Sequence, residues 1–285
     1  MLYDQGPLFK GGGMPVLEVQ ATDRRKAGSL WLSRQAANVT SQDGEDGIIA
    51  EIFNIIQPRH KLCVEFGAHD GLSGSNSWQL IQRLGWNAML IEADKTRFAE
   101  LAARYASQPG VRALNKQVEL EGENRIDNLL GSADLPTPDM MVIDVDGMDW
   151  HIWSSMVCRP LVVVVEFNHT VPNDVLFIQD PNPSLNQGSS LRAFIELGRQ
   201  KGYELVATTI TNAFFVVGEL FGDFKIDDNG IDSMYFNEAW WSWIFQGYDG
   251  TLFLAGNNKL IWKNMLAIDP EDIQPLPHHL RKMGG

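Results

Sequence analysis

The stretch Leu62-Cys63-Val64-Glu65-Phe66-Gly67-Ala68-His69-Asp70-Gly71 decides the fold. Its first half is an apolar run of strand length, and the second half is a short loop bounded by Gly67 and Gly71. In open parallel sheets, ligands bind beyond the carboxyl ends of the strands, and glycine lets the backbone approach a ligand closely. The stretch therefore predicts a buried strand that ends in a ligand-binding loop.

Strands and helices alternate on both sides of this stretch. We expect further strands at 88–91, 111–115, 140–145 and 161–165, and a closing hairpin from 203–208 and 213–217. We expect helices at 77–84, 97–105, 126–130 and 191–201, and one that begins near Ser41–Asp46. This order predicts an α/β fold, a Rossmann-like, doubly wound and mostly parallel sheet with an antiparallel C-terminal edge hairpin.

Changes in composition along the chain suggest three parts. Residues 1–40 are poorly patterned, contain Gly11–Gly13 and are expected to form an N-terminal arm. Residues 41–221 carry the Rossmann-like domain, and residues 222–285 form a Trp-rich extension with indoles at positions 240, 241, 243 and 262. The extension could pack as additional core, or it could form a homo-oligomer contact or a platform for a substrate, because indole faces bind flat apolar surfaces.

The composition excludes several classes of protein. The formal net charge of −13 disfavours binding to nucleic acid, because an acidic surface repels phosphates. The longest apolar runs are too short to cross a bilayer, and the N-terminus does not read as a signal peptide, so no membrane partner is expected. Two cysteines in apolar runs, without a zinc-binding pattern, fit a reducing compartment. We expect a cytoplasmic protein.

The glycine loop has an acidic partner at the spacing that a nucleoside ligand requires. Glu92 ends the next predicted strand, 21 positions after Gly71, where an acid can bind ribose hydroxyls. The dinucleotide pattern G-x-G-x-x-G is absent, and acids around the loop disfavour a pyrophosphate. They suit a ligand with an ammonium and a sulfonium, which is S-adenosylmethionine. An ordinary turn after a strand is the alternative.

Four short motifs carry a family resemblance: residues 65–71, Ser75-Asn76-Ser77, Leu90-Ile91-Glu92-Ala93 and Ile143-Asp144-Val145-Asp146-Gly147. With Ser41-Gln42 and Glu45-Asp46, they resemble the FkbM-like branch of class I methyltransferases over roughly residues 41–220. The resemblance implies methyl transfer from S-adenosylmethionine. It implies a cofactor site formed by Gln42, Glu65, Gly67, Ala68, Asp70, Gly71, Asn76, Glu92, Ala93, Asn115 and Asp144.

The resemblance also gives these residues roles. Glu65, Gly67 and Asp70 would shape the methionine end of the pocket. Glu92 would hold the ribose, Asn115 would lie near the adenine, and Asp144 would close the pocket beside the sulfonium.

Polar side chains follow the fourth and fifth predicted strands, which should end at the same sheet edge. They are Asp144, Asp146, Asp149 and His151 after one strand, and Glu166, Asn168 and His169 after the other. In one hypothesis Asp146, His151 or His169 is a general base for the methyl acceptor. In the other, Asp144 or Asp146 with Glu166 and Asn168 binds Mg²⁺ or another divalent cation, similar to metal-dependent catechol-type O-methyltransferases. Helix capping by these acids is the alternative to both.

The expected activity is therefore O-methylation of a small-molecule or glycan hydroxyl. The long segment 170–188, with prolines at 172, 181 and 183, is either an acceptor-binding loop or a surface insertion. Two other functions remain open at this point, a non-catalytic nucleotide-binding or scaffold module and a dinucleotide oxidoreductase.

Overall fold

The computed structural model describes residues 14–282 of the 285-residue chain, so the predicted break at Gly11–Gly13 lies outside the described residues. Two compact units make up the described chain. The larger unit contains Arg24–His169 and Asn173–Phe236, and the smaller unit contains residues 14–23, 170–172 and 237–282. Each unit is described by itself below.

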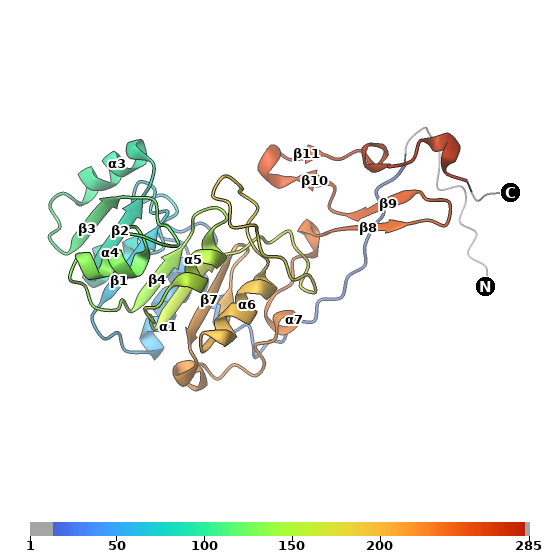
Figure 1. Ribbon diagram of the computed structural model, residues 1–285. Coiled ribbons are helices and arrows are strands. Elements are labelled where there is room, and N and C mark those ends of the chain that lie inside the picture. The colour runs from blue at the N-terminus through green and yellow to red at the C-terminus, as the bar shows by residue number, and fades with distance from the viewer. Residues whose placement is uncertain (1–13, 283–285) are drawn as a thin grey trace. The chain divides into compact units, whose positions relative to one another are not determined.

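A seven-stranded sheet forms the centre of the larger unit (Figure 1). Its strands are β1 (Leu62–Phe66), β2 (Asn87–Glu92), β3 (Val111–Asn115), β4 (Met140–Ile143), β5 (Val162–Glu166), β6 (Tyr203–Thr208) and β7 (Asn212–Val217). The strand order is β3-β2-β1-β4-β5-β7-β6, and all pairs are parallel except those made by β7. The predicted mostly parallel Rossmann-like sheet with an antiparallel edge hairpin is confirmed.

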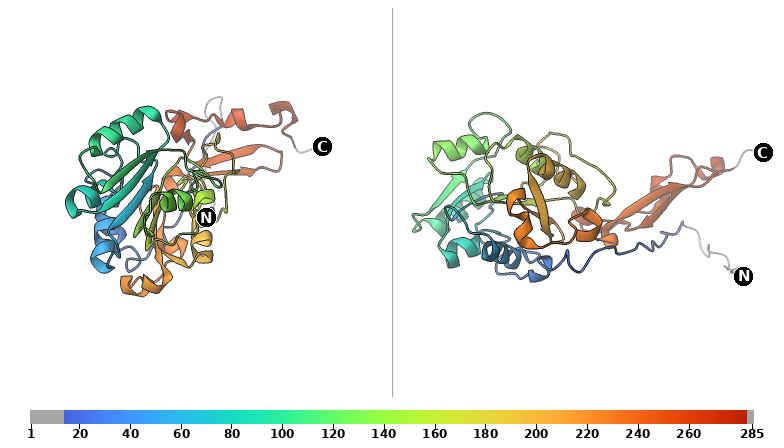
Figure 2. Two further views of the ribbon diagram at one scale, coloured as in Figure 1. Left: turned by 60° about the vertical axis from the view of Figure 1, so that its left-hand side comes forward. Right: turned by 90° about the horizontal axis from the view of Figure 1, so that it is seen from below.

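Helices cover both faces of this sheet. They are α1 (Glu45–Ile55), α2 (Trp78–Leu84), α3 (Lys95–Tyr105), α4 (Ile126–Ser132), α5 (Asp149–Ser155), α6 (Leu191–Gln200) and α7 (Ile231–Met234). Figure 2 shows α1 on the face opposite to α4 and α6. The sheet is therefore covered on both sides, which explains why β1, β4 and most of β5 are buried and, apart from Glu65 in β1, apolar.

The region after β4 differs from the prediction. The strand was expected to run to position 145, but it ends at Ile143, and the unpredicted helix α5 follows. The backbone N–H groups of Val145 and Gly147 donate to the Asp149 carboxylate at 2.8 and 2.7 Å instead of continuing the ladder. One buried acid thus ends the strand and starts a helix of seven residues, too short for its periodicity to stand out.

An aromatic cluster attaches α5 and α6 to the sheet. Trp153 of α5 is fully buried, and its ring lies 4.9 Å from Phe215 of β7, 5.7 Å from Tyr203 of β6 and 6.4 Å from Phe194 of α6. Such contacts between rings contribute beyond the area that they bury. They fix α5 and α6 against β6 and β7.

Residues 24–40, expected as part of an arm, belong to the larger unit. Leu32 is completely buried, Trp31 Nε1 donates to the Phe224 carbonyl at 2.9 Å, and Thr208 N donates to Ser33 Oγ at 3.1 Å. This segment and the residues that follow β7 therefore extend the core of the larger unit.

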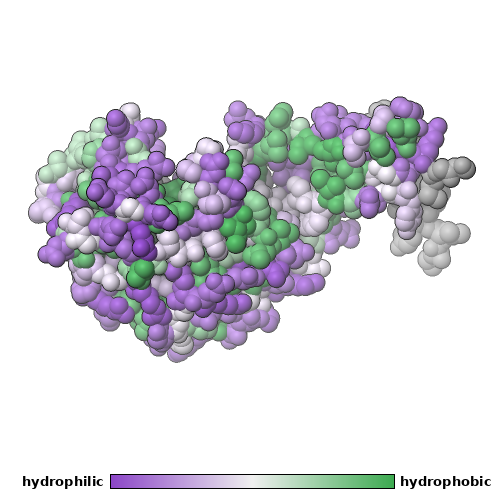
Figure 3. Space-filling view, viewed as in Figure 1, coloured by the Kyte–Doolittle hydropathy of each residue, from purple (hydrophilic) through white to green (hydrophobic). Residues whose placement is uncertain are grey.

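The smaller unit contains two antiparallel hairpins. One pairs β8 (Ser242–Gln246) with β9 (Leu252–Gly256), and the other pairs β10 (Lys259–Leu260) with β11 (Leu266–Ala267). Trp241 is buried, whereas Trp262 is 65% exposed, so the indoles do not form a single core. Figure 3 shows apolar residues gathered on the part that carries β10 and β11. Homo-oligomer formation through this unit stays a prediction. In residues 14–282, no helix has the length and apolar character needed to cross a membrane.

Asp139 aligns the beginnings of β1 and β4. It is fully buried, and its carboxylate accepts the N–H groups of Arg59, His60 and Leu62 at 2.6, 2.9 and 3.2 Å. Its own N–H donates to the Leu62 carbonyl. A buried side chain thus replaces hydrogen bonds that the sheet does not provide where the strands start.

Replacing Asp139 by asparagine should lower the free energy of unfolding by about 1–3 kcal/mol, because an amide nitrogen would face buried N–H groups. Urea unfolding measures this change. Asp134→Asn is the matched control, since Asp134 is exposed and has a left-handed φ of 51° that asparagine adopts readily. Equal stability of the two variants would contradict the role given to Asp139.

Candidate active site

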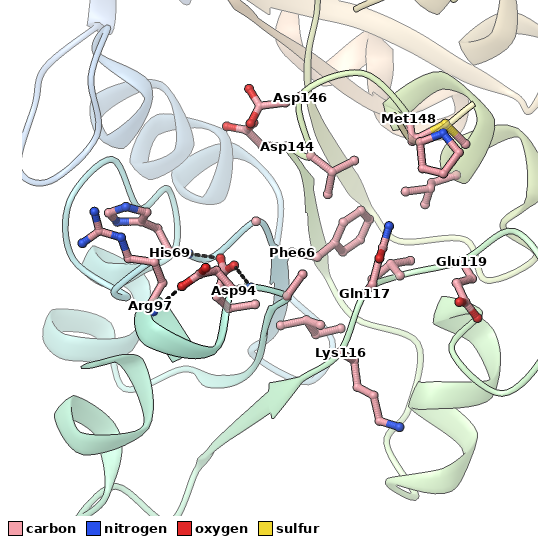
Figure 4. Close-up of a pocket in the computed structure, with 18 of the residues that line it drawn as sticks. Phe66, His69, Asp94, Arg97, Lys116, Gln117, Glu119, Asp144, Asp146 and Met148 are labelled. Atoms are coloured by element: carbon pink, nitrogen blue, oxygen red, sulfur yellow. Dashed lines mark hydrogen bonds between the residues drawn. The ribbon is translucent and has the colours of Figure 1, made fainter. Parts of the chain in front are cut away.

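A cavity of about 850 Å³ lies at the carboxyl ends of β1, β2 and β4. Among the predicted site residues, Gly67, Glu92, Ala93, Asp144 and Asp146 line it. Figure 4 shows Asp144 and Asp146 at one end of this cavity and His69, Asp94 and Arg97 at another. The site therefore has two halves, one around Glu92 and one around the acids that follow β4.

Gly67 forms the floor between these halves. Its φ is +75°, and a Cβ at this position would collide with the Asp144 carbonyl oxygen. Only glycine satisfies both the left-handed backbone and the lack of space. The loop after β1 and the turn after β4 are consequently in direct contact.

Glu92 ends β2 and is mostly buried. Its two carboxylate oxygens accept the N–H groups of His69 and Asp94 at 2.8 and 2.7 Å. Each carboxylate oxygen has two acceptor positions, so Glu92 keeps capacity to accept hydroxyl groups of a ligand in the cavity. The same side chain therefore holds the loop after β1 and lines the cavity.

Glu65 lies outside the residues that line the cavity. It is buried and accepts hydrogen bonds from Ser75 Oγ at 2.8 Å, Asn76 N at 2.7 Å and Ser77 Oγ at 2.5 Å. Burial raises the pKa of this carboxyl, while the hydrogen bonds act in the opposite direction. Glu65 thus fixes the 75–77 segment, where α2 begins, and acts on the protein itself.

Two residues predicted for the cofactor site, Asp70 and Gly71, contact the loop after β1 itself and helix α3. Asp70 accepts the N–H groups of Leu72 and Ser73 and pairs with Arg104 at 3.1 Å. Gly71 has a φ of +72°, and a Cβ there would meet Leu101 and Tyr105. Neither residue lines the cavity.

The remaining predicted cofactor residues also lie outside the lining set. Asn115 Nδ2 donates to the carbonyls of Glu92 and Ala93 at 2.8 and 3.1 Å and fixes the end of β2. Ala68 is buried, and its N–H donates to the Ile91 carbonyl. Gln42 accepts from Asn38 through its carbonyl, and its amide lies beside Gly74.

Three carboxylates meet at the other half of the site. Asp144 follows β4, Asp146 has a left-handed φ of 56°, and Glu166 ends β5. One oxygen from each of the three lies within 4.8 Å of the others. We call these residues the acid cluster. Asp149, which accepts the N–H groups of Val145 and Gly147, shapes the turn that carries Asp146.

The acid cluster is electrostatically unfavourable when all its members are ionised. Burial raises the pKa of both Asp144 and Glu166, and repulsion by Asp149 and Asp146 raises both further. Asp144 also raises the pKa of Glu166, whereas Glu166 lowers that of Asp144. Burial also raises the pKa of Asp149 to about 6. A positive charge placed among these carboxylates would relieve their repulsion.

The two predicted histidines and Asn168 do not line the cavity. His151 on α5 has Nε2 2.7 Å from the Gln179 carbonyl oxygen. His169 is buried, and burial lowers its pKa. Asn168 Nδ2 donates to the Gln187 carbonyl at 2.6 Å. Of the seven polar residues expected to converge, the structure brings Asp144, Asp146 and Glu166 together within reach of one ion.

Several lining residues were not predicted. Lys116 and Gln117 come directly after β3, so the strand-end rule applied to Glu92 could have found them. Met148, from the turn after β4, also lines the cavity, and no sequence pattern that we know marks it. Pro181 and Pro183 line the cavity from the 170–188 segment, for which the sequence left open a binding loop or a surface insertion.

Comparisons with known proteins give only distant similarities. No family model and no curated protein matches the chain. Among solved structures, the N-terminal domain of EvdMO1 with SAH bound has 13% identity and a TM-score of 0.42, over 62% of this chain and 80% of that one. A putative caffeoyl-CoA O-methyltransferase from Staphylococcus aureus has 14% identity and a TM-score of 0.43, over 65% and 88%. At these identities and scores, the function has to be argued from the site itself.

The charge of the acid cluster predicts a pH-dependent effect of Asp144→Asn. An acid with a raised pKa in the folded state destabilises the fold once the pH exceeds its unfolded pKa of about 4, and increasingly so up to the folded value. In buffer with a chelator, the variant should therefore gain about 1–3 kcal/mol over the wild type between pH 5 and pH 8.

Urea unfolding at the two pH values measures this gain. The exposed Asp134→Asn variant should show the same difference from the wild type at both values. An Asp144→Asn variant whose stability relative to the wild type does not rise between pH 5 and pH 8 would refute the electrostatic argument.

Proposed function

We propose that this chain is an S-adenosylmethionine-dependent methyltransferase that acts on a hydroxyl of a small molecule or sugar. One observation carries the proposal. A single cavity at the carboxyl ends of β1, β2 and β4 joins the Glu92 half to the acid cluster half. A nucleoside methyl donor and an oxygen nucleophile need this arrangement, because methyl transfer by displacement depends on holding the two in line.

The Glu92 half favours a cationic nucleoside over a dinucleotide. A pyrophosphate needs free backbone N–H groups at a helix that follows the glycine loop. Here the N–H groups of His69, Leu72 and Ser73 are occupied by Glu92 and Asp70. The lining instead carries five acids, at positions 92, 94, 119, 144 and 146, against two basic residues, at positions 97 and 116. These residues fit a ligand with ribose hydroxyls and positive charges, and S-adenosylmethionine would supply an activated methyl group there.

The acid cluster fits a divalent cation. Its donors are all carboxylate oxygens, the ligand type that Mg²⁺, Ca²⁺ and Mn²⁺ prefer. A bound cation would lower the pKa of an acceptor hydroxyl. Asp144 and Asp146 also line the cavity, so they face the space left for an acceptor. The two histidines proposed as bases do not line it, and this difference supports the metal over a histidine base; Asp146 lines the cavity under either hypothesis.

Glu92→Ala should weaken binding of S-adenosylhomocysteine by about 10- to 100-fold, because hydrogen bonds from the ligand to a carboxylate are lost. Calorimetry measures the dissociation constant. The control is Glu123→Ala, since Glu123 is exposed and outside the lining set. Glu92 also holds the loop after β1, so Glu92→Gln serves if the alanine variant melts early. Absence of wild-type binding at millimolar ligand would end the proposal.

Methyl transfer should require the metal. With labelled S-adenosylmethionine and a panel that includes 3,4-dihydroxybenzoate and methyl glucoside, a chelator should lower the rate by at least about 100-fold, and added Mg²⁺ should restore it. Asp146→Asn should reduce the rate with Mg²⁺ present. Unchanged transfer in the chelator would exclude the metal and favour a base. Cofactor binding without transfer to any panel member would favour a non-catalytic module.

A further inference from the structure

Gln179 is an unusually placed residue in the loop between β5 and α6. Its side chain is polar and long, yet only 1% of the residue is exposed, although Asp180 and Ile178 on either side are exposed. Burying an amide is costly unless its donors and acceptors are satisfied. The cost indicates that Gln179 has a specific task in this loop.

The amide of Gln179 closes the loop on itself. Its Oε1 accepts the N–H groups of Gln187 at 2.7 Å and Gly188 at 2.9 Å, and its Nε2 donates to the Leu185 carbonyl at 2.8 Å. The backbone N–H of Gln179 donates to Ser189 Oγ. Both ends of the 179–189 segment are thereby held together through one side chain.

The same residue contacts the turn that carries Asp146. Gly147 has a φ of +143°, and a Cβ there would lie 2.5 Å from Gln179 Oε1 and 2.9 Å from the Leu185 carbonyl oxygen. The Gln179 carbonyl is also bound to His151 of α5. The loop is therefore packed directly against the turn after β4.

A second connection ties the loop to β5. Asn168, two residues beyond Glu166, donates through Nδ2 to the Gln187 carbonyl and through its N–H to the Ser189 carbonyl. The loop is thus fixed to both strand ends that carry the acid cluster. His151 and Asn168 thus contribute hydrogen bonds that hold this loop in place.

Between the fixed points, the loop presents Pro181 and Pro183 to the cavity. The pyrrolidine ring fixes φ at each of these positions, so this part of the wall has little freedom of its own. Hydrogen bonds from Asn182 N to the Asp180 carbonyl and from Leu185 N to the Asn182 carbonyl restrict the tip further.

We propose that Gln179 is a positioning residue that holds Pro181 and Pro183 as a preformed wall beside the acid cluster, so that the wall orients the acceptor. The inference rests on the proposed function, which assigns the acceptor to the acid cluster half of the cavity. It adds that acceptor specificity depends on a buried amide that touches neither acceptor nor cofactor.

Gln179→Met tests the proposal, because methionine has a similar length and lacks the amide. The control is Gln187→Met, the same chemical change at an exposed side chain of the same loop. With the panel acceptor that is methylated fastest, kcat/KM for Gln179→Met should fall at least about tenfold, largely through kcat, since the acceptor loses its productive orientation. Binding of S-adenosylhomocysteine should stay within about twofold of the wild type, because the Glu92 half is untouched.

Hydrogen exchange gives an independent measurement on the same proteins. Amides of the 181–189 segment should exchange at least about tenfold faster in Gln179→Met, and those of β1 should not change. A parallel loss of cofactor binding and kcat would show a merely structural role. Unchanged exchange in the segment would overturn the inference even if the wild type binds no S-adenosylhomocysteine, a result that by itself refutes only the proposed function.

Discussion

The contact between Gly67 and the Asp144 carbonyl is the constraint on which the site depends. It lies where the chain turns from β1 toward β2 on one side and β4 lies on the other, so the strand order reverses at this point. Ligands of open parallel sheets bind at such reversals. Because no side chain fits between the two loops, they form one continuous floor. Glu92 then stands on one side of that floor and the acid cluster on the other.

Buried carboxylates organise the backbone around this floor. Asp139, Glu65 and Asp149 each accept two or more hydrogen bonds from main-chain or hydroxyl groups that the sheet leaves unpaired. Asp144 and Glu166 differ, because their main neighbours are other acids. The chain therefore uses the same side-chain type for two purposes, and the surroundings decide which purpose applies. A carboxylate surrounded by N–H groups stabilises the fold, and one surrounded by carboxylates is available to a cation.

This double use explains how far the sequence predicts the site. Alternation of apolar runs places the strands well, and β1, β3 and β6 have the expected bounds. The strand-end rule also brings Glu92, Asp144 and Asp146 to the cavity. The rule does not predict the direction of a side chain, and for this reason it was wrong for three residues. Glu65 and Asn115 lie outside the lining of the cavity, and His151 contacts the loop after β5. Gln179 could not be found, because its role arises from contacts across a loop without periodicity.

The floor and the rim of the cavity differ in how much variation they tolerate. Position 67 accepts no side chain without separating the loops after β1 and β4. The loop after β5 instead has exposed side chains at positions 182, 184 and 186, on a backbone held from within. Under the proposed function, chains with the same floor and different residues at those three positions would bind the same cofactor and differ in acceptor. The floor at position 67 is thus sterically constrained, whereas the exposed positions of the loop after β5 are free of that constraint.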